Sequence, residues 1–220
     1  MLLLFTLPAW AAPFAVQVGE SRIGFDAPPG FADTTSTGSP RLQELAESLT
    51  SASNRILLFA ISDLDLRRFM GGDPPELRRY MLAVTPKGME REWVTRNAFE
   101  VLVGDALREL GPPAPAGKSL AEALASQPPG KASLLTELRR DPDVVSVLQG
   151  ARLPPPQGRP QERPQYLLST TTLLLMRGKA LNLAVYSGYD SPADLDWIRS
   201  TTARWIEELH RLNGARRSRE

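Results

Sequence analysis

The chain of 220 residues contains no cysteine and a single histidine, His210. Without thiols it can form no disulfide, no thiolate nucleophile and no cysteine-ligated zinc or iron–sulfur site. A lone histidine also excludes zinc sites built from two or three imidazoles. Stability must therefore come from a buried hydrophobic core, and we expect neither a metal nor a cofactor.

The chain also lacks an excess of charge of either sign. Lysine and arginine together number 26 against 25 acidic residues, which gives a net charge of +1. This balance offers no electrostatic case for nucleic acid, an anionic membrane or an acidic substrate. We interpret the arginine doublets at 67–68, 78–79 and 139–140 as solvated surface charge.

Long apolar runs are missing too, since none reaches the roughly 20 residues that a transmembrane helix needs. Residues 1–12 do combine a short apolar run with small residues spaced Ala9-x-Ala11, which is the pattern of a secretory signal and its cleavage site. No lysine or arginine precedes that run. We expect a cleaved signal peptide and a periplasmic or secreted protein. The alternatives are an uncleaved membrane tether, a buried first strand or a disordered start.

Motifs that mark an enzyme are absent. There is no Gly-x-Ser-x-Gly elbow, no phosphate-binding Gly-x-Gly-x-x-Gly and no Walker-type loop. Asp63 and Asp65 follow a predicted strand, and Asp190 and Asp194 suit helix capping, without calcium-loop spacing. We therefore predict no catalytic residues and no metal ligands. The alternative is an envelope hydrolase or metal-binding enzyme that uses Asp190 or His210.

What the sequence does contain most clearly is a β-hairpin that leads into an amphipathic helix, between Tyr166 and Leu212. The hydrophobic period changes from two to about 3.6 near residues 190–192. The hairpin turn is either Arg177-Gly178 or Gly178-Lys179, and both choices leave the same side chains on the same faces. One face is almost wholly apolar, and we expect the helix stripe that includes Trp205 to cover it.

The opposite face of this hairpin is mixed in character. It carries Thr171 and Leu173 on the first strand and Asn182 and Tyr186 on the second. Core formation and helix capping account for the other side chains of the unit but leave this face unexplained. We therefore predict that these four residues bind a ligand or a partner.

Periodicity and turn residues predict the remaining elements. They are a hairpin at 14–18 and 21–26, a helix from Pro40, buried strands at 55–62 and 78–84, a helix at 88–110, helical pieces at 119–126 and 131–140, and a strand at 143–148. We expect a single α+β domain over 13–213, with a mainly antiparallel sheet flanked by helices. Residues 114–140 form a helical elaboration, 154–164 a proline-rich linker and 214–220 a disordered basic tail.

Two stretches resemble known families. Residues 24–31, reading Gly-Phe-Asp-Ala-Pro-Pro-Gly-Phe, resemble the strand and Pro-Pro-Gly-aromatic turn of the PsbP-like superfamily. Residues 177–186 and 191–197 look like the end of a group of uncharacterised exported proteobacterial proteins. The resemblance implies an α/β/α sandwich with an antiparallel sheet and a non-enzymatic binding or assembly factor, for a protein partner or a small ligand. It carries over no site residues.

Overall fold

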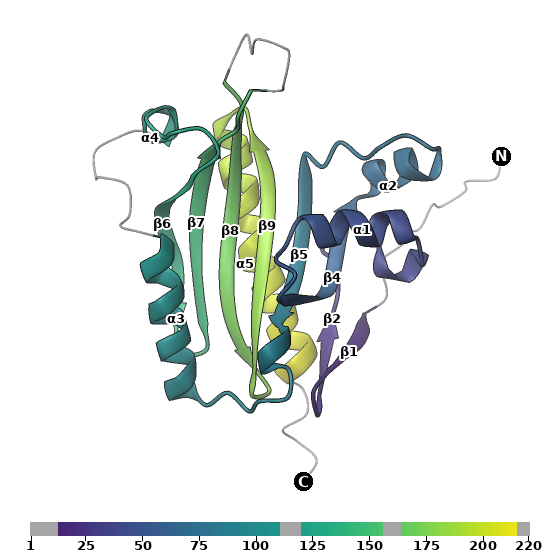
Figure 1. Ribbon diagram of the computed structural model, residues 1–220, viewed down its shortest axis with the longest axis vertical. Coiled ribbons are helices and arrows are strands. Elements are labelled where there is room, and N and C mark those ends of the chain that lie inside the picture. The colour runs from purple at the N-terminus through teal and green to yellow at the C-terminus, as the bar shows by residue number, and fades with distance from the viewer. Residues whose placement is uncertain (1–12, 111–119, 156–163, 215–220) are drawn as a thin grey trace, which may run out of the picture.

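A seven-stranded antiparallel sheet forms the centre of the molecule (Figure 1). The computed structural model describes residues 13–110, 120–155 and 164–214. The predicted signal peptide, the tail beyond 214 and residues 156–163 of the proline-rich linker lie outside the described residues.

The strands follow the spatial order β3-β4-β5-β9-β8-β7-β6. Their bounds are β3 Phe31–Asp33, β4 Asn54–Ser62, β5 Arg79–Pro86, β6 Ala132–Asp141, β7 Val144–Arg152, β8 Tyr166–Met176 and β9 Lys179–Tyr189. β1 (Phe14–Val18) and β2 (Ser21–Phe25) pair as a separate hairpin, as predicted. The helices are α1 Pro40–Ser48, α2 Asp63–Met70, α3 Arg96–Leu110, α4 Leu120–Ala125 and α5 Pro192–Gly214.

The predicted hairpin and helix at the C-terminus are confirmed. Met176 pairs with Lys179, which places the turn at Arg177-Gly178. Both turn residues have positive φ, 51° and 72°, as a two-residue hairpin turn that follows strand twist requires. Alternate residues of both strands are buried on one face, and α5 packs over that face with Trp205 at 1% exposure.

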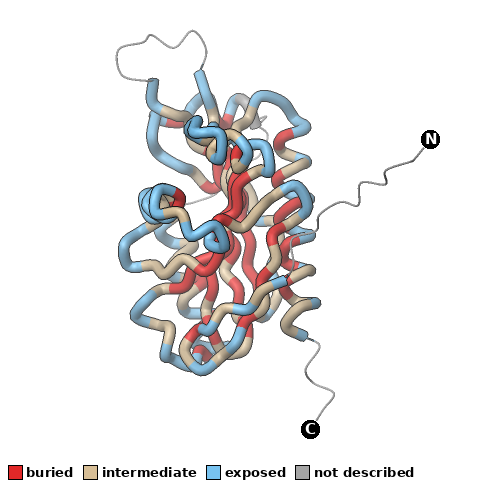
Figure 2. The backbone as a smooth tube through the Cα atoms, turned by 90° about the vertical axis from the view of Figure 1, so that its right-hand side faces the viewer, coloured by how far each residue is buried: buried red, intermediate tan, exposed pale blue. Residues whose placement is uncertain are grey.

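Helices cover both faces of the sheet. We call the side that carries α5 and the β1–β2 hairpin the back face and the other side the front face. On the front, α1 packs Leu42 and Ala46 over β4 and β5, while α3 packs Phe99 and Val103 over β7 and β8. Figure 2 shows buried residues concentrated along the strands between these layers. The α+β fold and its α/β/α layering are therefore as predicted.

Three local predictions are wrong. Residues 131–140 are not helical but form most of β6, an edge strand. Two irregularities in its pairing with β7, at Leu134/Thr136 and Glu137/Arg139, break the period of two and leave leucines at a helix-like spacing. The helix predicted from 88 begins at Arg96, after a 3-10 turn at Lys87–Met89. Residues 63–70, predicted to follow a strand as a turn, form α2.

The hairpin turn offers a test of this packing. A Cβ added at Gly178 would lie 2.5 Å from two ring atoms of Trp93, whereas one added at Gly30 would meet nothing within 4 Å. Both glycines have positive φ, so alanine costs about 1 kcal/mol or more at either site. We expect Gly178→Ala to lose about 1 kcal/mol more than Gly30→Ala in urea unfolding, because the indole must move. Equal losses would show that Trp93 does not pack on the turn.

Candidate functional site

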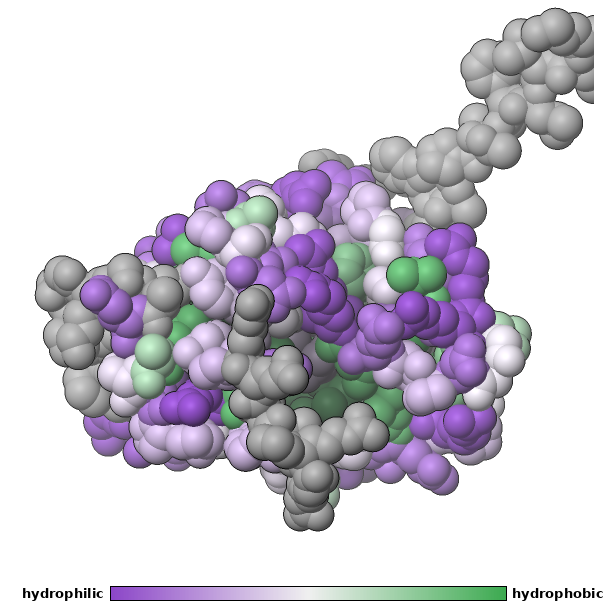
Figure 3. Space-filling view, turned by 90° about the horizontal axis from the view of Figure 1, so that it is seen from above, coloured by the Kyte–Doolittle hydropathy of each residue, from purple (hydrophilic) through white to green (hydrophobic). Residues whose placement is uncertain are grey.

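A strip of the front face lies between the parts of the sheet that α1 and α3 cover (Figure 1). We define this central strip by six half-buried residues on two strands: Ser169, Thr171 and Leu173 of β8, and Asn182, Ala184 and Tyr186 of β9. Seen from above, the molecule is hollowed on the side of its front face, and the hollow has a largely hydrophobic lining (Figure 3).

Strand register arranges the strip in three rows that cross the sheet. Tyr186 pairs with Tyr80 of β5 on one side and with Ser169 on the other. Ala184 pairs with Leu82 and with Thr171 in the next row, and Asn182 pairs with Val84 and with Leu173 in the third. Small side chains in the first two rows therefore lie beside a large aromatic one.

An aromatic wall bounds the strip on the α1 side. The rings of Tyr186 and Tyr80 stack with centroids 4.4 Å apart and an interplanar angle of 8°, and Phe59 meets Tyr80 edge-on at 6.4 Å. Burial raises the pKa of Tyr186, and burial together with the neighbouring Tyr186 raises the pKa of Tyr80. Both phenols are therefore neutral at physiological pH.

Amide and hydroxyl groups supply the polar part of the strip. The Gln149 amide, on β7, donates from Nε2 to Thr171 Oγ1 at 2.7 Å, and Gln149 is only 7% exposed. Asn182 Oδ1 is buried and has no hydrogen-bond partner. A buried acceptor without a donor costs about 1–3 kcal/mol, so Asn182 is held at the expense of stability.

The structure places all four predicted site residues on one face, within the strip. Tyr186 also packs against the cluster beneath α1, and Leu173 against the cluster beneath α3. Sequence reasoning missed Ser169 and Ala184, although their period of two with Thr171 and Asn182 assigns them to the same face. It could not find Tyr80 or Gln149, because only the strand order brings β5 and β7 beside this hairpin.

A second concave region lies beside α1. It is a cavity of about 530 Å³ between α1, the start of β4 and the segment after β3. Its cations are already engaged: Arg55 pairs with Glu90 at 3.1 Å, and Lys87 donates to the backbone oxygen of Ala52 at 2.7 Å. Hydroxyl and amide side chains make up most of its remaining polar lining. This arrangement favours no particular chemistry.

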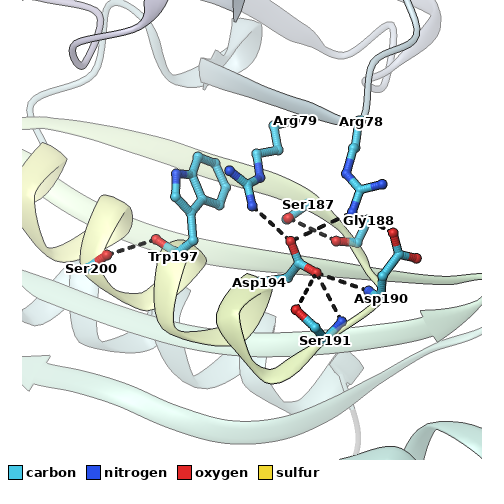
Figure 4. A network of polar contacts seen from close by, with 9 residues as sticks. All are labelled: Arg78, Arg79, Ser187, Gly188, Asp190, Ser191, Asp194, Trp197 and Ser200. Atoms are coloured by element: carbon cyan, nitrogen blue, oxygen red, sulfur yellow. Dashed lines mark hydrogen bonds and ion pairs between the residues drawn. The ribbon is translucent and has the colours of Figure 1, made fainter.

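The acidic group at the start of α5 forms a structural network (Figure 4). Asp194 Oδ2 accepts from the backbone N–H groups of Asp190 and Ser191 at 3.0 and 3.1 Å, and Asp194 Oδ1 accepts from Arg79 at 2.8 Å. The guanidinium of Arg79 lies 4.2 Å from the ring centroid of Trp197. Burial alone would raise the pKa of Asp194, but these hydrogen bonds outweigh it and hold the pKa below its usual range.

The structure does not bring Asp190 and His210 together. They lie at opposite ends of α5, about 30 Å apart at 1.5 Å per residue. Asp190 forms an ion pair with Arg78, and His210 Nε2 is buried without a partner. Among residues 13–110, 120–155 and 164–214, no three histidine or acidic side chains are grouped to hold a metal ion. None of the helices described there is long and apolar enough to cross a membrane.

Comparison with known proteins gives a structural resemblance only. No protein-family model matches the chain, and neither does any curated protein. The Ran-binding protein Mog1p of Saccharomyces cerevisiae matches with a TM-score of 0.38 and 12% identity, over 93% of each chain. A mutant of protein Mog1 matches with a TM-score of 0.37 and 12% identity, over 92% of this chain and 93% of that one.

These two matches assign the chain to no family. Both TM-scores are below 0.5 and the identity is low, so neither bears on function. The α/β/α description rests on the strand order and helix positions of the chain itself.

Proposed function

We propose that this chain is an exported, non-enzymatic protein of the cell envelope that binds a protein partner or a small ligand through the central strip. The observation that carries the proposal is the buried, unpartnered amide oxygen of Asn182 on a half-buried face. A polar group kept at such a cost is typical of a site whose partner is missing.

The amino-terminal sequence supports the compartment. Residues 1–12 carry the secretory pattern, and other stretches resemble exported proteobacterial proteins and the PsbP-like superfamily. We expect protein expressed from its own start in a Gram-negative host to appear in the periplasm. Its intact mass should correspond to cleavage after Ala11 or Ala12. Full-length protein that stays in the cytoplasm would contradict export, and full-length protein in the membrane fraction would indicate a tether.

Asn182 should trade stability for binding. Replacing it with leucine, which has a similar volume, removes the unpaired acceptor, so we expect the free energy of unfolding to rise by about 1–2 kcal/mol. Gln149→Leu is the matched control. It breaks the bond to Thr171 and should lower the free energy of unfolding by about 1 kcal/mol.

Urea denaturation of the two variants tests this assignment. A loss of stability in Asn182→Leu similar to that in Gln149→Leu would show that the Asn182 amide is satisfied in the folded protein. The proposal would then lose the observation on which it rests.

A further inference from the structure

The strand residues that cross the central strip carry no charge. On β5, β7, β8 and β9, the front positions between α1 and α3 are aliphatic, aromatic, hydroxyl or amide side chains. A charged ligand would lose its hydration there without meeting a counter-ion on these strands, at a cost of several kcal/mol. The strip is therefore complementary to an uncharged ligand.

Tyr186 offers the strip a flat surface. One face of its ring is stacked on Tyr80, and on the other side of the same row lies Ser169, whose side chain is short. No other aromatic ring of the described residues stacks on Tyr186. Aromatic faces carry negative partial charge and attract the weakly positive C–H groups of a ligand. A ligand with a flat, C–H-rich face fits beside this ring.

The polar groups of the strip require a ligand rich in hydroxyl or amide groups. Asn182 Oδ1 needs a donor, while the Thr171 hydroxyl already accepts from Gln149 and can itself donate. From Asn182 to Tyr186 the strand advances by about 13 Å at 3.3 Å per residue, which is longer than one six-membered ring. The ligand therefore has donors and acceptors at both ends and spans more than one ring.

We infer that the central strip binds a neutral oligosaccharide, with one ring face on Tyr186 and hydroxyl or acetamido groups hydrogen-bonded to Asn182 and Thr171. This inference rests on the proposed function, because it names the ligand class of the same site. A neutral sugar combines an apolar ring face with uncharged donors and acceptors. A charged metabolite or an acidic peptide lacks the second property.

A titration followed by amide NMR of the purified full chain tests the inference. The probe is N,N′-diacetylchitobiose, and the control is the same disaccharide without acetyl groups, which carries two ammonium groups. We expect saturable shifts at Ser169, Thr171 and Ala184 with the neutral probe, with a Kd on the order of 1 mM. The charged control should bind at least about tenfold more weakly, because its ammonium groups find no counter-charge.

Variants separate stacking from folding. Tyr186→Ala should weaken probe binding about tenfold or more, whereas Tyr186→Phe, which keeps the ring, should bind within about threefold of the unmodified protein. Should Tyr186→Ala fail to fold, Ala184→Leu serves instead. It adds apolar volume to the middle row of the strip and should block the probe while the spectrum stays dispersed.

The outcomes also distinguish this inference from the proposal beneath it. If neither chitobiose nor cellobiose shifts the strip amides but a capped neutral tripeptide does, the saccharide is wrong and the binding function stands. If the charged disaccharide binds as well as the neutral one, the argument from charge fails. If no probe shifts the strip and no partner is crosslinked to it in cells, both are wrong.

Discussion

Replacing Trp205 with alanine is expected to lower the free energy of unfolding by about 4 kcal/mol, which is a large part of the 5–15 kcal/mol that holds a typical domain together. The indole is 1% exposed in the core between α5 and the back face of the sheet. Its Nε1 donates to the backbone oxygen of Asp26 at 3.1 Å, which ties α5 to the end of β2. The variant loses both the packing and this hydrogen bond.

Trp93 is the matched control. It is 70% exposed, so Trp93→Ala should cost about 1 kcal/mol or less. Chemical denaturation monitored by circular dichroism measures both variants without relying on the fluorescence of the deleted residue. Similar losses for the two would mean that α5 is not docked on the sheet as described.

Asp194→Ala is expected to be the second most damaging change, with a loss of about 2–3 kcal/mol. It removes the acceptor for two backbone N–H groups at the start of α5 and leaves the Arg79 guanidinium without its closest carboxylate. Asp190→Ala deletes only an exposed ion pair with Arg78 and should cost at most about 1 kcal/mol. Equal losses in urea denaturation would show that Asp194 does not hold the network together.

The same network gives a pH dependence of defined sign. The pKa of Asp194 is lowered in the folded state, so its contribution is fully present above its unfolded pKa of about 3.9 and is lost as pH falls through the folded value. Burial and the nearby Glu208 raise the pKa of Asp26, which therefore acts in the opposite direction. We expect Asp194→Ala to flatten the loss of stability in acid below about pH 4, as measured by urea unfolding at several pH values.

The sequence predicted the C-terminal unit well because its local and tertiary preferences agree. Leu174, Leu181 and Trp205 occupy the face that is buried, and Asp194 caps the helix as expected. β6 was predicted wrongly because two pairing irregularities hide its alternation. Register bulges depend on the neighbouring strand and leave no mark in the periodicity of one segment.

The candidate site could be predicted only within one hairpin. Thr171, Leu173, Asn182 and Tyr186 were found because an unexplained mixed face can be recognised from a period of two. Tyr80 and Gln149 reach the strip through pairing between strands that are distant in sequence. The missing partner of Asn182 Oδ1 depends on three-dimensional packing and has no signature in the sequence.

The most direct test of the account is site-specific photo-crosslinking in living cells. The variant Ala184→p-benzoylphenylalanine places the probe inside the central strip, and Glu100→p-benzoylphenylalanine places it at an exposed position of α3. Binding through the strip predicts an envelope-derived adduct, detected by intact mass and electrophoresis, at position 184 and not at 100. Identical patterns at the two positions, or no adduct at 184, would contradict it.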